Sequence, residues 1–458
     1  MTTASLRNIF LKNAVANVIG GIGSALFNLL LPALVVRYLG KLEFSVWSLA
    51  LQVLIYLQLF GFGLQTAMTK FIAHAHELND LDDQRKTMKA GLVIVTGFVF
   101  VAMFAVTVLV IFYPLLFKNI PPELIGEFRI CISLLGISAA WQLFALIPMG
   151  VFVGLHRNII PVSGQLFVRM FSLLALWLVL KNGAGLLVLS LTMALSSALI
   201  VPINFLAIRR WASALITALG PMEKKRFGDL LKYCGNLAIW NIAMLLVNGL
   251  SIMIVGHFDF KNVAAYSLAS TVIAIMIGLQ QAIISPLLPA GAKLNAREET
   301  RHELPKLMIS ATRICIAGLI LSVIGLYFFG VNFLQAWLGK GYSEDILKLL
   351  LILAIANMIR NIALPYSMLL LAINMQKQVR LTVFVEGVVT LLASITLGYQ
   401  YGAFGVAYGA LIGSLSGFFC NYMFNFSSTR LIVPDIFLFT LKSGVFLSLP
   451  VAAFVLVF

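Results

Sequence analysis

The sequence predicts an all-α polytopic membrane protein of about 12 transmembrane helices in two pseudo-symmetric six-helix lobes around a central cavity. The chain has 458 residues, of which 61% are hydrophobic, and its mean hydropathy is +1.01. Apolar stretches of about twenty residues recur from end to end, which is the length that an α-helix needs to cross a bilayer. A transmembrane β-barrel would show short alternating segments instead.

Each apolar stretch is long enough for one span. A last stretch, at about 436–458, contains Lys442 and is either a thirteenth span or an interfacial helix. The first stretch is too long for the core of a signal peptide and has no small-residue cleavage site, so it also counts as a span. The twelve predicted spans cover about 13–36, 44–70, 90–117, 130–154, 159–180, 184–208, 233–256, 264–288, 307–329, 345–371, 381–399 and 403–426.

The distribution of basic residues predicts a cytoplasmic N-terminus. With the N-terminus inside, 21 of the 32 Lys and Arg residues fall in inside loops, 7 fall in outside loops, and 4 lie within segments. Cytoplasmic loops carry such an excess, so the bias sets the orientation. It also accounts for the net charge of +15 without a nucleic-acid partner.

The predicted domains are two lobes, 1–208 and 233–428, separated by a basic connector, 209–232, and followed by an apolar tail, 429–458. The connector contains an apolar run, Trp211–Leu219, between basic clusters, which is typical of an amphipathic segment on an anionic membrane surface. An internal repeat supports two lobes. Trp47–Ala50 reappears as Tyr266–Ala269 at an offset of 219, and Leu166–Arg169 reappears as Val383–Glu386 at an offset of 217.

Two arginines near the middle of apolar stretches are the main candidate site residues. A charge at bilayer depth is costly, by roughly 3 kcal/mol on insertion scales, so it usually faces a watery cavity on a transport path. Arg169 lies about ten residues from either end of its span, too far to reach the interface easily. Arg360 lies between Asn357 and Asn361, and Pro365 follows, which predicts a kinked helix with a polar face. An inter-helix hydrogen-bond cluster is the alternative for this patch.

Glu386 is the only acidic residue inside an apolar stretch, and two roles stay open for it. It could simply neutralise a nearby arginine. It could also gain and lose a proton during a transport cycle, and the balance between burial and pairing decides which. By the second repeat, Arg169 and Glu386 would occupy corresponding positions of the two lobes.

Uncharged polar residues form a second group of candidates for the lining of a cavity. Asn17 and Asn28 are eleven residues apart, hence on one face of the first span, and Gln52 and Tyr56 are four apart in the second. The seventh span contains Asn236 and Asn241. Any one of these residues could instead form an inter-helix hydrogen bond, but together they would suit a hydroxyl-rich cargo.

The sequence contains no sign of catalysis, a cofactor or a metal. The five histidines fall in predicted loops, and no phosphate-binding or nucleophile motif occurs. The four cysteines lack metal-ligand spacing. We therefore expect a transporter that is not an enzyme and that uses an ion gradient, the membrane potential or the cargo gradient.

Four segments in chain order resemble motifs of the Wzx-type lipid-linked oligosaccharide flippases of the multidrug/oligosaccharidyl-lipid/polysaccharide exporter superfamily. The segments are Arg37–Gly40, Phe60–Leu64 with the basic Lys70 beyond it, Trp337–Tyr342 and Tyr401–Ala407. The resemblance implies two lobes, alternating access and a cationic lumen, to which Arg37 and Lys70 would contribute with Arg169 and Arg360. It also implies the cargo, an undecaprenyl-pyrophosphate-linked repeat unit of the O-antigen or capsule type.

By this resemblance the protein would move its cargo from the inner to the outer leaflet of a bacterial inner membrane. Membrane lipids, and a polysaccharide polymerase with its chain-length regulator, would be its partners. Two alternatives remain within the same superfamily. A multidrug cation antiporter would want membrane-embedded carboxylates, of which only Glu386 qualifies, and a flippase for the peptidoglycan precursor would carry a related lipid.

Overall fold

The computed structural model describes residues 3–58, 61–117, 119–216, 223–248, 250–373, 375 and 380–457. Side chains are described from residue 18 onward, with gaps that include 236, 238–248, 380–381 and 456–457. The described residues are helical almost throughout and contain no strand, which confirms the predicted fold class. By its internal contacts the chain divides into two compact units, Met1–Ile242 and Ala243–Phe458.

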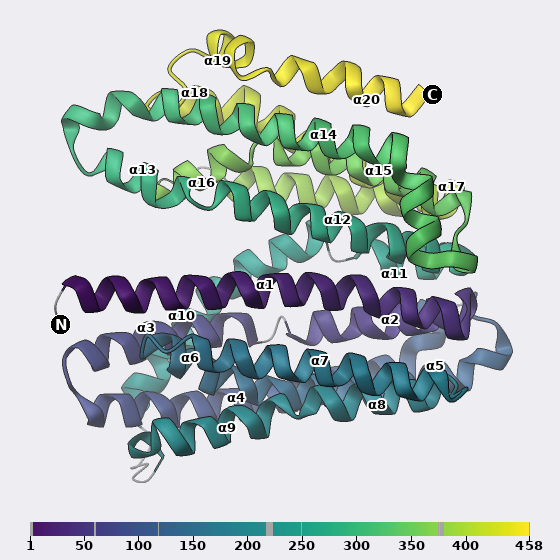
Figure 1. Ribbon diagram of the computed structural model, residues 1–458, viewed down its shortest axis with the longest axis horizontal. Coiled ribbons are helices and arrows are strands. Elements are labelled where there is room, and N and C mark those ends of the chain that lie inside the picture. Colours follow the sequence, from purple (N-terminus) through teal and green to yellow (C-terminus); the bar gives the residue numbers. More distant parts are fainter. Residues whose placement is uncertain are drawn as a thin grey trace. The chain divides into compact units, whose positions relative to one another are not determined.

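The helices of each unit run alongside one another (Figure 1). The first unit contains α1 Thr3–Leu39, α2 Lys41–Gln58, α3 Phe62–Glu77, α4 Leu81–Leu116, α5 Pro122–Gln142, α6 Leu146–Gly154, α7 Ile159–Lys181, α8 Leu186–Ala198 and α9 Ile200–Trp211. Helix α10 Lys224–Asn248 joins the units, and the second contains α11 Ser251–Phe258, α12 Val263–Ile284, α13 Leu287–Asn295, α14 Leu304–Leu338, α15 Glu344–Asn361, α16 Leu364–Ala372, α17 Arg380–Cys420, α18 Phe426–Ser428, α19 Ile436–Ser443 and α20 Ser448–Val457.

The two units repeat the same packing. In the first, α2 packs against α5, α3 against α6 and α4 against α5; in the second, α12 packs against α15, α13 against α16 and α14 against α15. Both units also break a span at the same point, between α5 and α6 and between α15 and α16. The division falls inside α10, and the predicted boundaries at 208 and 233 stay a prediction.

Ten helical segments of the described residues are long and apolar enough to cross a membrane, or eleven if the bent pair α19–α20 is one span. The difference between ten segments and the twelve predicted spans has two sources. The predicted eleventh and twelfth spans are the two arms of α17, which are separate helices that meet at a kink at the non-helical residue Gly402 and form one continuous segment. The predicted seventh span coincides with α10 and α11, where residue 249 and most side chains of 236–248 lie outside the described part.

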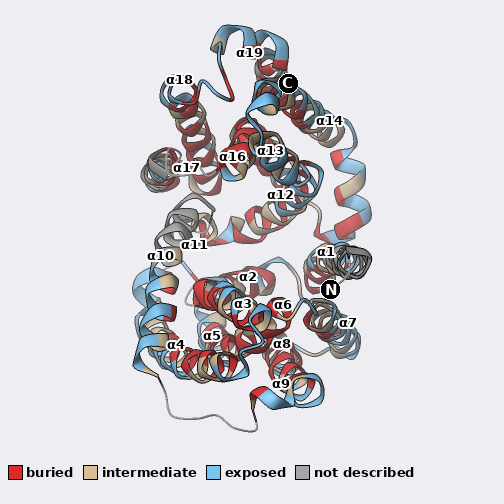
Figure 2. Ribbon diagram, turned by 90° about the vertical axis from the view of Figure 1, so that its left-hand side faces the viewer, coloured by how far each residue is buried: buried red, intermediate tan, exposed pale blue. Residues whose placement is uncertain are grey.

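Large apolar side chains cover the outer surfaces of the bundles. On α4, Phe100 and Phe104 are more than 70% exposed, and on α14 Leu321 and Phe328 are similarly open. In each unit the inward helix faces are buried and the outward faces are exposed (Figure 2). Exposure of so much apolar surface to water would be unfavourable, whereas contact with lipid acyl chains is not. The chain is a multi-pass membrane protein.

In the first unit, basic residues predicted to lie inside gather at one end. Arg226 forms an ion pair with Asp83, and the Lys86 ammonium lies 3.2 Å from the Glu223 carboxylate. The Arg85 guanidinium donates to the Ala214 carbonyl at 2.8 Å. Loops that are far apart in the sequence thus meet at this end, which we call the basic end. That it faces the cytoplasm stays a prediction.

The C-terminal stretch is not one straight span. Helices α19 and α20 meet at an angle of 55°, and Gly444 between them has a φ of +78°. Glycine is suited to this left-handed backbone because it has no Cβ. Both helices pack against α14, so the stretch is a broken helix that lies along the second unit.

Candidate functional site

Arg169 lies near the middle of α7, beside the close contact of α7 with α1. A Cβ on Gly20 would lie 2.7 Å from Val162 Cγ1, and one on Gly23 would lie 2.2 Å from Leu166 Cδ1. The glycines therefore let the two helices run parallel at short distance. Residues 162, 166 and 169 follow one side of α7 at helical spacing, so Arg169 continues this contact by one turn.

The Arg169 guanidinium has no carboxylate beside it. Its side chain is half-buried, and it forms no hydrogen bond or ion pair with any residue in the described part of the chain. It lies about ten residues, or roughly 15 Å, from the start of α7. The Gln165 amide, one turn earlier, contacts the Met149 sulfur at 3.6 Å. Arg169 thus offers several free N–H donors at the depth of the hydrocarbon layer.

Helix α1 exposes two stripes of different chemistry. One stripe is apolar and consists of Ile19, Ile22, Leu26 and Leu30, all more than 40% exposed. The other contains small and polar residues at helical spacing, Gly21, Ser24 and Asn28. An apolar stripe suits lipid, and the polar stripe suits a wet surface. The predicted Asn17 would continue the polar stripe, but its side chain lies outside the described residues.

Arg360 is paired, in contrast to Arg169. Its Nε lies 2.5 Å from Glu386 Oε1, which joins α15 to α17. The side chains are 20% and 11% exposed, respectively, so the pair is largely shielded from solvent. Because the two charges cancel, this part of the second unit has little net charge. Glu386 thus lies against an arginine, and which of its two predicted roles it has in a transport cycle stays a prediction.

A cluster of amides joins the same part of α15 to α12. Asn361 Nδ2 donates to Asn357 Oδ1 at 2.6 Å and to Gln280 Oε1 of α12 at 3.0 Å. The predicted polar patch on α15 is therefore also an inter-helix hydrogen-bond cluster. Two donors, Asn357 Nδ2 and Gln280 Nε2, are buried without a partner among the described residues. Unused donors of this kind favour an acceptor-rich ligand or ordered water.

The predicted kink follows Arg360. Helix α15 ends at Asn361, two turn residues follow, and α16 begins at Leu364 with Pro365 in its first turn. Proline fits the first turn because no intrahelical bond is needed there. The freed Asn361 carbonyl accepts a hydrogen bond from the Cys315 thiol at 3.3 Å. The break thus lies beside the Arg360–Glu386 pair.

The two arms of α17 pack so closely that only glycine fits on the second arm where they meet. Gly405, Gly409, Gly413 and Gly417 form a stripe on the second arm, and a Cβ on each would lie within 2.5 Å of an atom of Leu397, Ser394, Thr390 and Glu386, respectively. Such glycine stripes allow close antiparallel packing in membranes. The turn is held by Asp259, whose carboxylate accepts from the Ala403 backbone N–H at 3.1 Å. Glu386 lies at the far end of this stripe.

The burial pattern corrects the predicted correspondence of Arg169 with Glu386. On α7 the buried face contains Gly164, Val168, Ser172 and Leu176, and on α17 it contains Thr382, Glu386, Thr390 and Ser394. The two sets differ by 218, not 217, and the ends of α6 and α16 differ by 218 as well. Glu386 therefore corresponds to Val168, and Arg169 lies one residue, about 100° of helix rotation, away from that face.

The remaining predicted residues do not join one cluster. Gln52 is buried and shares a side-chain hydrogen bond with Tyr56 within α2. Arg37 is exposed in the last turn of α1. Lys70 is exposed on α3, with its ammonium 4.6 Å from the centre of the Tyr233 ring. The side chains of Asn236 and Asn241 lie outside the described residues.

Arg37 and Lys70 lie at different levels of the first unit. About thirty helical residues of α2 and α3 separate them, roughly 40 Å along the bundle. They therefore do not share one binding site with Arg169 in this conformation. The resemblance implied that these residues share one cationic lumen. The order of motifs in the sequence does not say how far apart they lie along the helix bundle.

Several residues that build the second unit were not among the predicted site residues. Asn425 Nδ2 donates to Thr382 Oγ1 at 2.6 Å and to Asn421 Oδ1 at 2.7 Å. The Tyr366 hydroxyl and Thr429 Oγ1 are 2.8 Å apart. The four-residue spacing of Asn421 and Asn425 was the available signal. Among the described residues, no three His, Cys, Asp or Glu side chains gather as metal ligands.

Comparison with known proteins identifies the fold. Residues 19–178 match the family described as MatE. A structure described as the lipid II flippase MurJ in an inward closed conformation aligns with a TM-score of 0.71 and 16% identity over 97% of this chain and 98% of that chain. At this identity the alignment shows that the two chains share a fold. A sequence comparison with curated proteins finds no match.

Two further solved structures have the same fold. An inward-facing multidrug resistance MATE family transporter of the MOP superfamily aligns with a TM-score of 0.71 and 14% identity over 89% of this chain and 94% of that chain. A MOP superfamily transporter from Pyrococcus furiosus aligns with a TM-score of 0.57 and 12% identity over 92% of this chain and 96% of that chain. Its description notes a binding pocket of reversed polarity.

Proposed function

We propose that this protein is a flippase that moves an undecaprenyl-pyrophosphate-linked oligosaccharide repeat unit, of the O-antigen or capsule type, to the outer leaflet of a bacterial inner membrane. One observation carries the proposal: Arg169 is a cation in the middle of a span with no carboxylate beside it among the described residues. A buried cation without a partner is unfavourable. An anionic headgroup that passes through the protein would remove this penalty while it is bound.

The cargo would meet different surfaces of the first unit. Its pyrophosphate would accept charge-assisted hydrogen bonds from the Arg169 guanidinium. The polar stripe of α1, with Ser24 and Asn28, would contact the glycan through hydrogen bonds. The polyprenyl chain would stay in the bilayer. The outer surfaces of both units are apolar, so the chain could move along them without entering water.

The Arg360–Glu386 pair would have a different role. While paired, Arg360 contributes no net charge to cargo binding. Protonation of Glu386 would release Arg360 and add a second cation to the second unit. The pair is therefore our candidate for coupling cargo binding to proton movement, and its position beside the break between α15 and α16 would let it influence the bend.

The direction of transport is electrostatically favourable. A pyrophosphate diester carries about two negative charges. Moving them outward across an inside-negative potential of about 100 mV releases roughly 4–5 kcal/mol. No nucleotide hydrolysis is needed for such a step, and alternating access between the units is sufficient. A polysaccharide polymerase and a chain-length regulator would act on the delivered unit.

The decisive experiment measures surface glycan in cells whose only copy of the protein is a variant. Arg169→Ala should abolish the surface glycan, cause lipid-linked repeat units to accumulate, and leave the protein level unchanged. Arg129→Ala, an exposed arginine on α5, is the matched control and should behave as wild type. Normal surface glycan in Arg169→Ala cells would refute the proposal.

Two other functions are distinguished by simple assays. Export of organic cations would need a carboxylate available to the cargo, but Glu386 lies against Arg360 at 2.5 Å. Unchanged dye resistance on deletion would exclude this function, and loss of dye efflux would favour it. A flippase for the peptidoglycan precursor would use the same cationic site, but its deletion should be lethal rather than affect only the surface glycan.

A further inference from the structure

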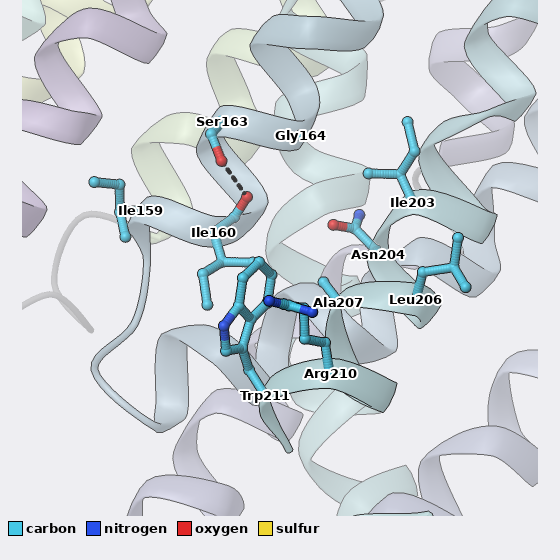
Figure 3. A pocket seen from close by; sticks show the side chains of 10 residues that line it. All are labelled: Ile159, Ile160, Ser163, Gly164, Ile203, Asn204, Leu206, Ala207, Arg210 and Trp211. Atoms are coloured by element: carbon cyan, nitrogen blue, oxygen red, sulfur yellow. Dashed lines mark hydrogen bonds between the residues drawn. The ribbon is translucent and has the colours of Figure 1, made fainter. Parts of the chain in front are cut away.

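A cavity of about 400 Å³ lies between α7 and α9 near the basic end of the first unit. Figure 3 shows its lining side chains, which come from the start of α7 and the last turns of α9. Most of the wall is apolar, and the lining residues are Ile159, Ile160, Ser163, Gly164, Ile203, Asn204, Leu206, Ala207, Arg210 and Trp211. Arg210 is the charged residue among them and none is acidic, so the cavity carries net positive charge.

Asn204 is the unexplained group in this cavity. Its side chain is 1% exposed, and neither its Nδ2 nor its Oδ1 has a hydrogen-bond partner among the described residues. An unmade hydrogen bond of a buried amide costs about 1–3 kcal/mol. In Figure 3 the amide projects from α9 toward the cavity wall formed by Gly164. Gly164 leaves this space open, since a Cβ there would be 3.5 Å from Asn204 Oδ1.

The equivalent place in the second unit is filled and satisfied. At the offset of 218, Gly164 corresponds to Thr382, Ile203 to Asn421 and Ala207 to Asn425. There the Asn425 amide donates to both Thr382 and Asn421. The same fold can therefore close this space with its own side chains. In the first unit Gly164, Ile203 and Ala207 provide no polar side chain at these positions, and a cavity remains there.

The mouth of the cavity has the chemistry of a membrane surface. Arg210 lies over the Trp211 ring, with 5.9 Å between the guanidinium carbon and the ring centre. Trp211 is half-exposed, and tryptophan favours the level of lipid headgroups. Asn204 lies six residues before Arg210 on α9, roughly 9 Å deeper in the cavity. The lining thus has a cation at its mouth and an amide deeper along α9, with apolar side chains such as Leu206 between them.

We propose that this cavity binds one anionic glycerophospholipid from the leaflet at the basic end. The phosphate would lie at Arg210, and the ester-linked glycerol would accept from and donate to the Asn204 amide. The first part of an acyl chain would contact Ile203 and Leu206. Basic pockets between transmembrane helices bind anionic headgroups by this combination of charge and depth. The site is independent of the transport function proposed above.

The test measures lipid retention by the purified full-length protein with native mass spectrometry. Phosphatidylglycerol is the probe, and phosphatidylethanolamine is the zwitterionic comparison. Wild type should retain one phosphatidylglycerol at least tenfold more strongly than phosphatidylethanolamine. Arg210→Gln and Asn204→Leu should each weaken this retention about tenfold. Inorganic phosphate at millimolar concentration should not displace the lipid.

Two controls keep the test decisive. Arg209→Gln removes the neighbouring charge, which lies in the same last turn of α9 but does not line the cavity, and should leave retention unchanged. Ser163→Phe should fill the cavity and abolish retention without removing a charge. Equal loss in Arg209→Gln and Arg210→Gln would mean general surface attraction only. Unchanged retention in Asn204→Leu and Ser163→Phe, or displacement by phosphate, would also overturn the proposal.

Discussion

In the first unit a mid-span arginine, Arg169, lies half-buried with no carboxylate of the described residues beside it, whereas in the second unit Arg360 lies against Glu386. The two units share their packing and their broken spans. The difference therefore comes from a few side chains and not from the backbone. A duplicated fold has been specialised so that one unit presents a charge and the other holds a neutral pair.

The largest expected effect concerns the stability of that pair. Arg360→Gln or Glu386→Gln should each lower the free energy of unfolding by about 3–5 kcal/mol, because each leaves one buried charge uncompensated. The double variant should recover most of this loss. Equilibrium unfolding of the purified protein in mixed detergent micelles measures it. Equal losses in the single and double variants would contradict a direct pair.

Arg169 should show the opposite behaviour, with a large loss of transport and little loss of stability. Charged hydrogen bonds contribute about 1.5–3 kcal/mol, so Arg169→Gln should reduce transport roughly tenfold to hundredfold. Arg169→Lys should retain more activity, since the charge remains but the planar fork is lost. Accumulation of lipid-linked repeat units measures transport. If Arg169→Gln instead unfolds as readily as Arg360→Gln, the contrast between the units is wrong.

The helix pair that holds Glu386 offers a third test. Gly413→Ala would place a Cβ 1.8 Å from Thr390 Oγ1, so the arms of α17 must separate, at a cost of about 1–3 kcal/mol. The matched control is Gly318→Ala on α14, where nothing lies within 4 Å of the new Cβ. It should be neutral or stabilising by up to about 1 kcal/mol. Similar melting temperatures for both variants would exclude tight contact between the arms.

The smallest expected effect would make the first unit resemble the second. Gly164→Ser should give Asn204 a hydroxyl partner, as Thr382 gives one to Asn425, and should stabilise the protein by about 0.5–1 kcal/mol. Gly97→Ser, in open space on α4, controls for the change in helix propensity. The unfolding midpoint provides the measurement. If Gly97→Ser raises the stability as much as Gly164→Ser does, a hydrogen bond to Asn204 is not the cause.

Apolar segment length was sufficient to predict the fold class and nearly every span. It works because a bilayer requires about twenty apolar residues per helix whatever the side-chain details. Arg360 and Pro365 likewise predicted a polar patch and a break, since proline disrupts a helix locally. These features depend on one segment at a time, and the structure agrees with them.

Contacts between segments were harder to predict. The sequence left open whether Glu386 neutralises an arginine or exchanges a proton, because pairing depends on which face of α17 meets α15. The repeat offset of 217 was wrong by one residue, and in a helix one residue turns a side chain by about 100°. That shift separates Val168, which is buried, from Arg169. The cavity at Asn204 exists because Gly164 has no side chain. A single glycine changes neither the apolar pattern nor the charge pattern of the sequence, so the cavity could not be predicted from either.

The glycine stripe of α17 has a mechanical consequence. Since Ser394, Thr390 and Glu386 of the first arm contact glycines of the second, the arms cannot slide past each other without colliding, and the hairpin should move as one rigid body. Bending is left to the interruptions after Gln142 and Asn361, where the helical ladder is already broken. Spin labels placed on both arms of α17 should therefore keep a constant separation throughout a working cycle, while labels across either interruption should not.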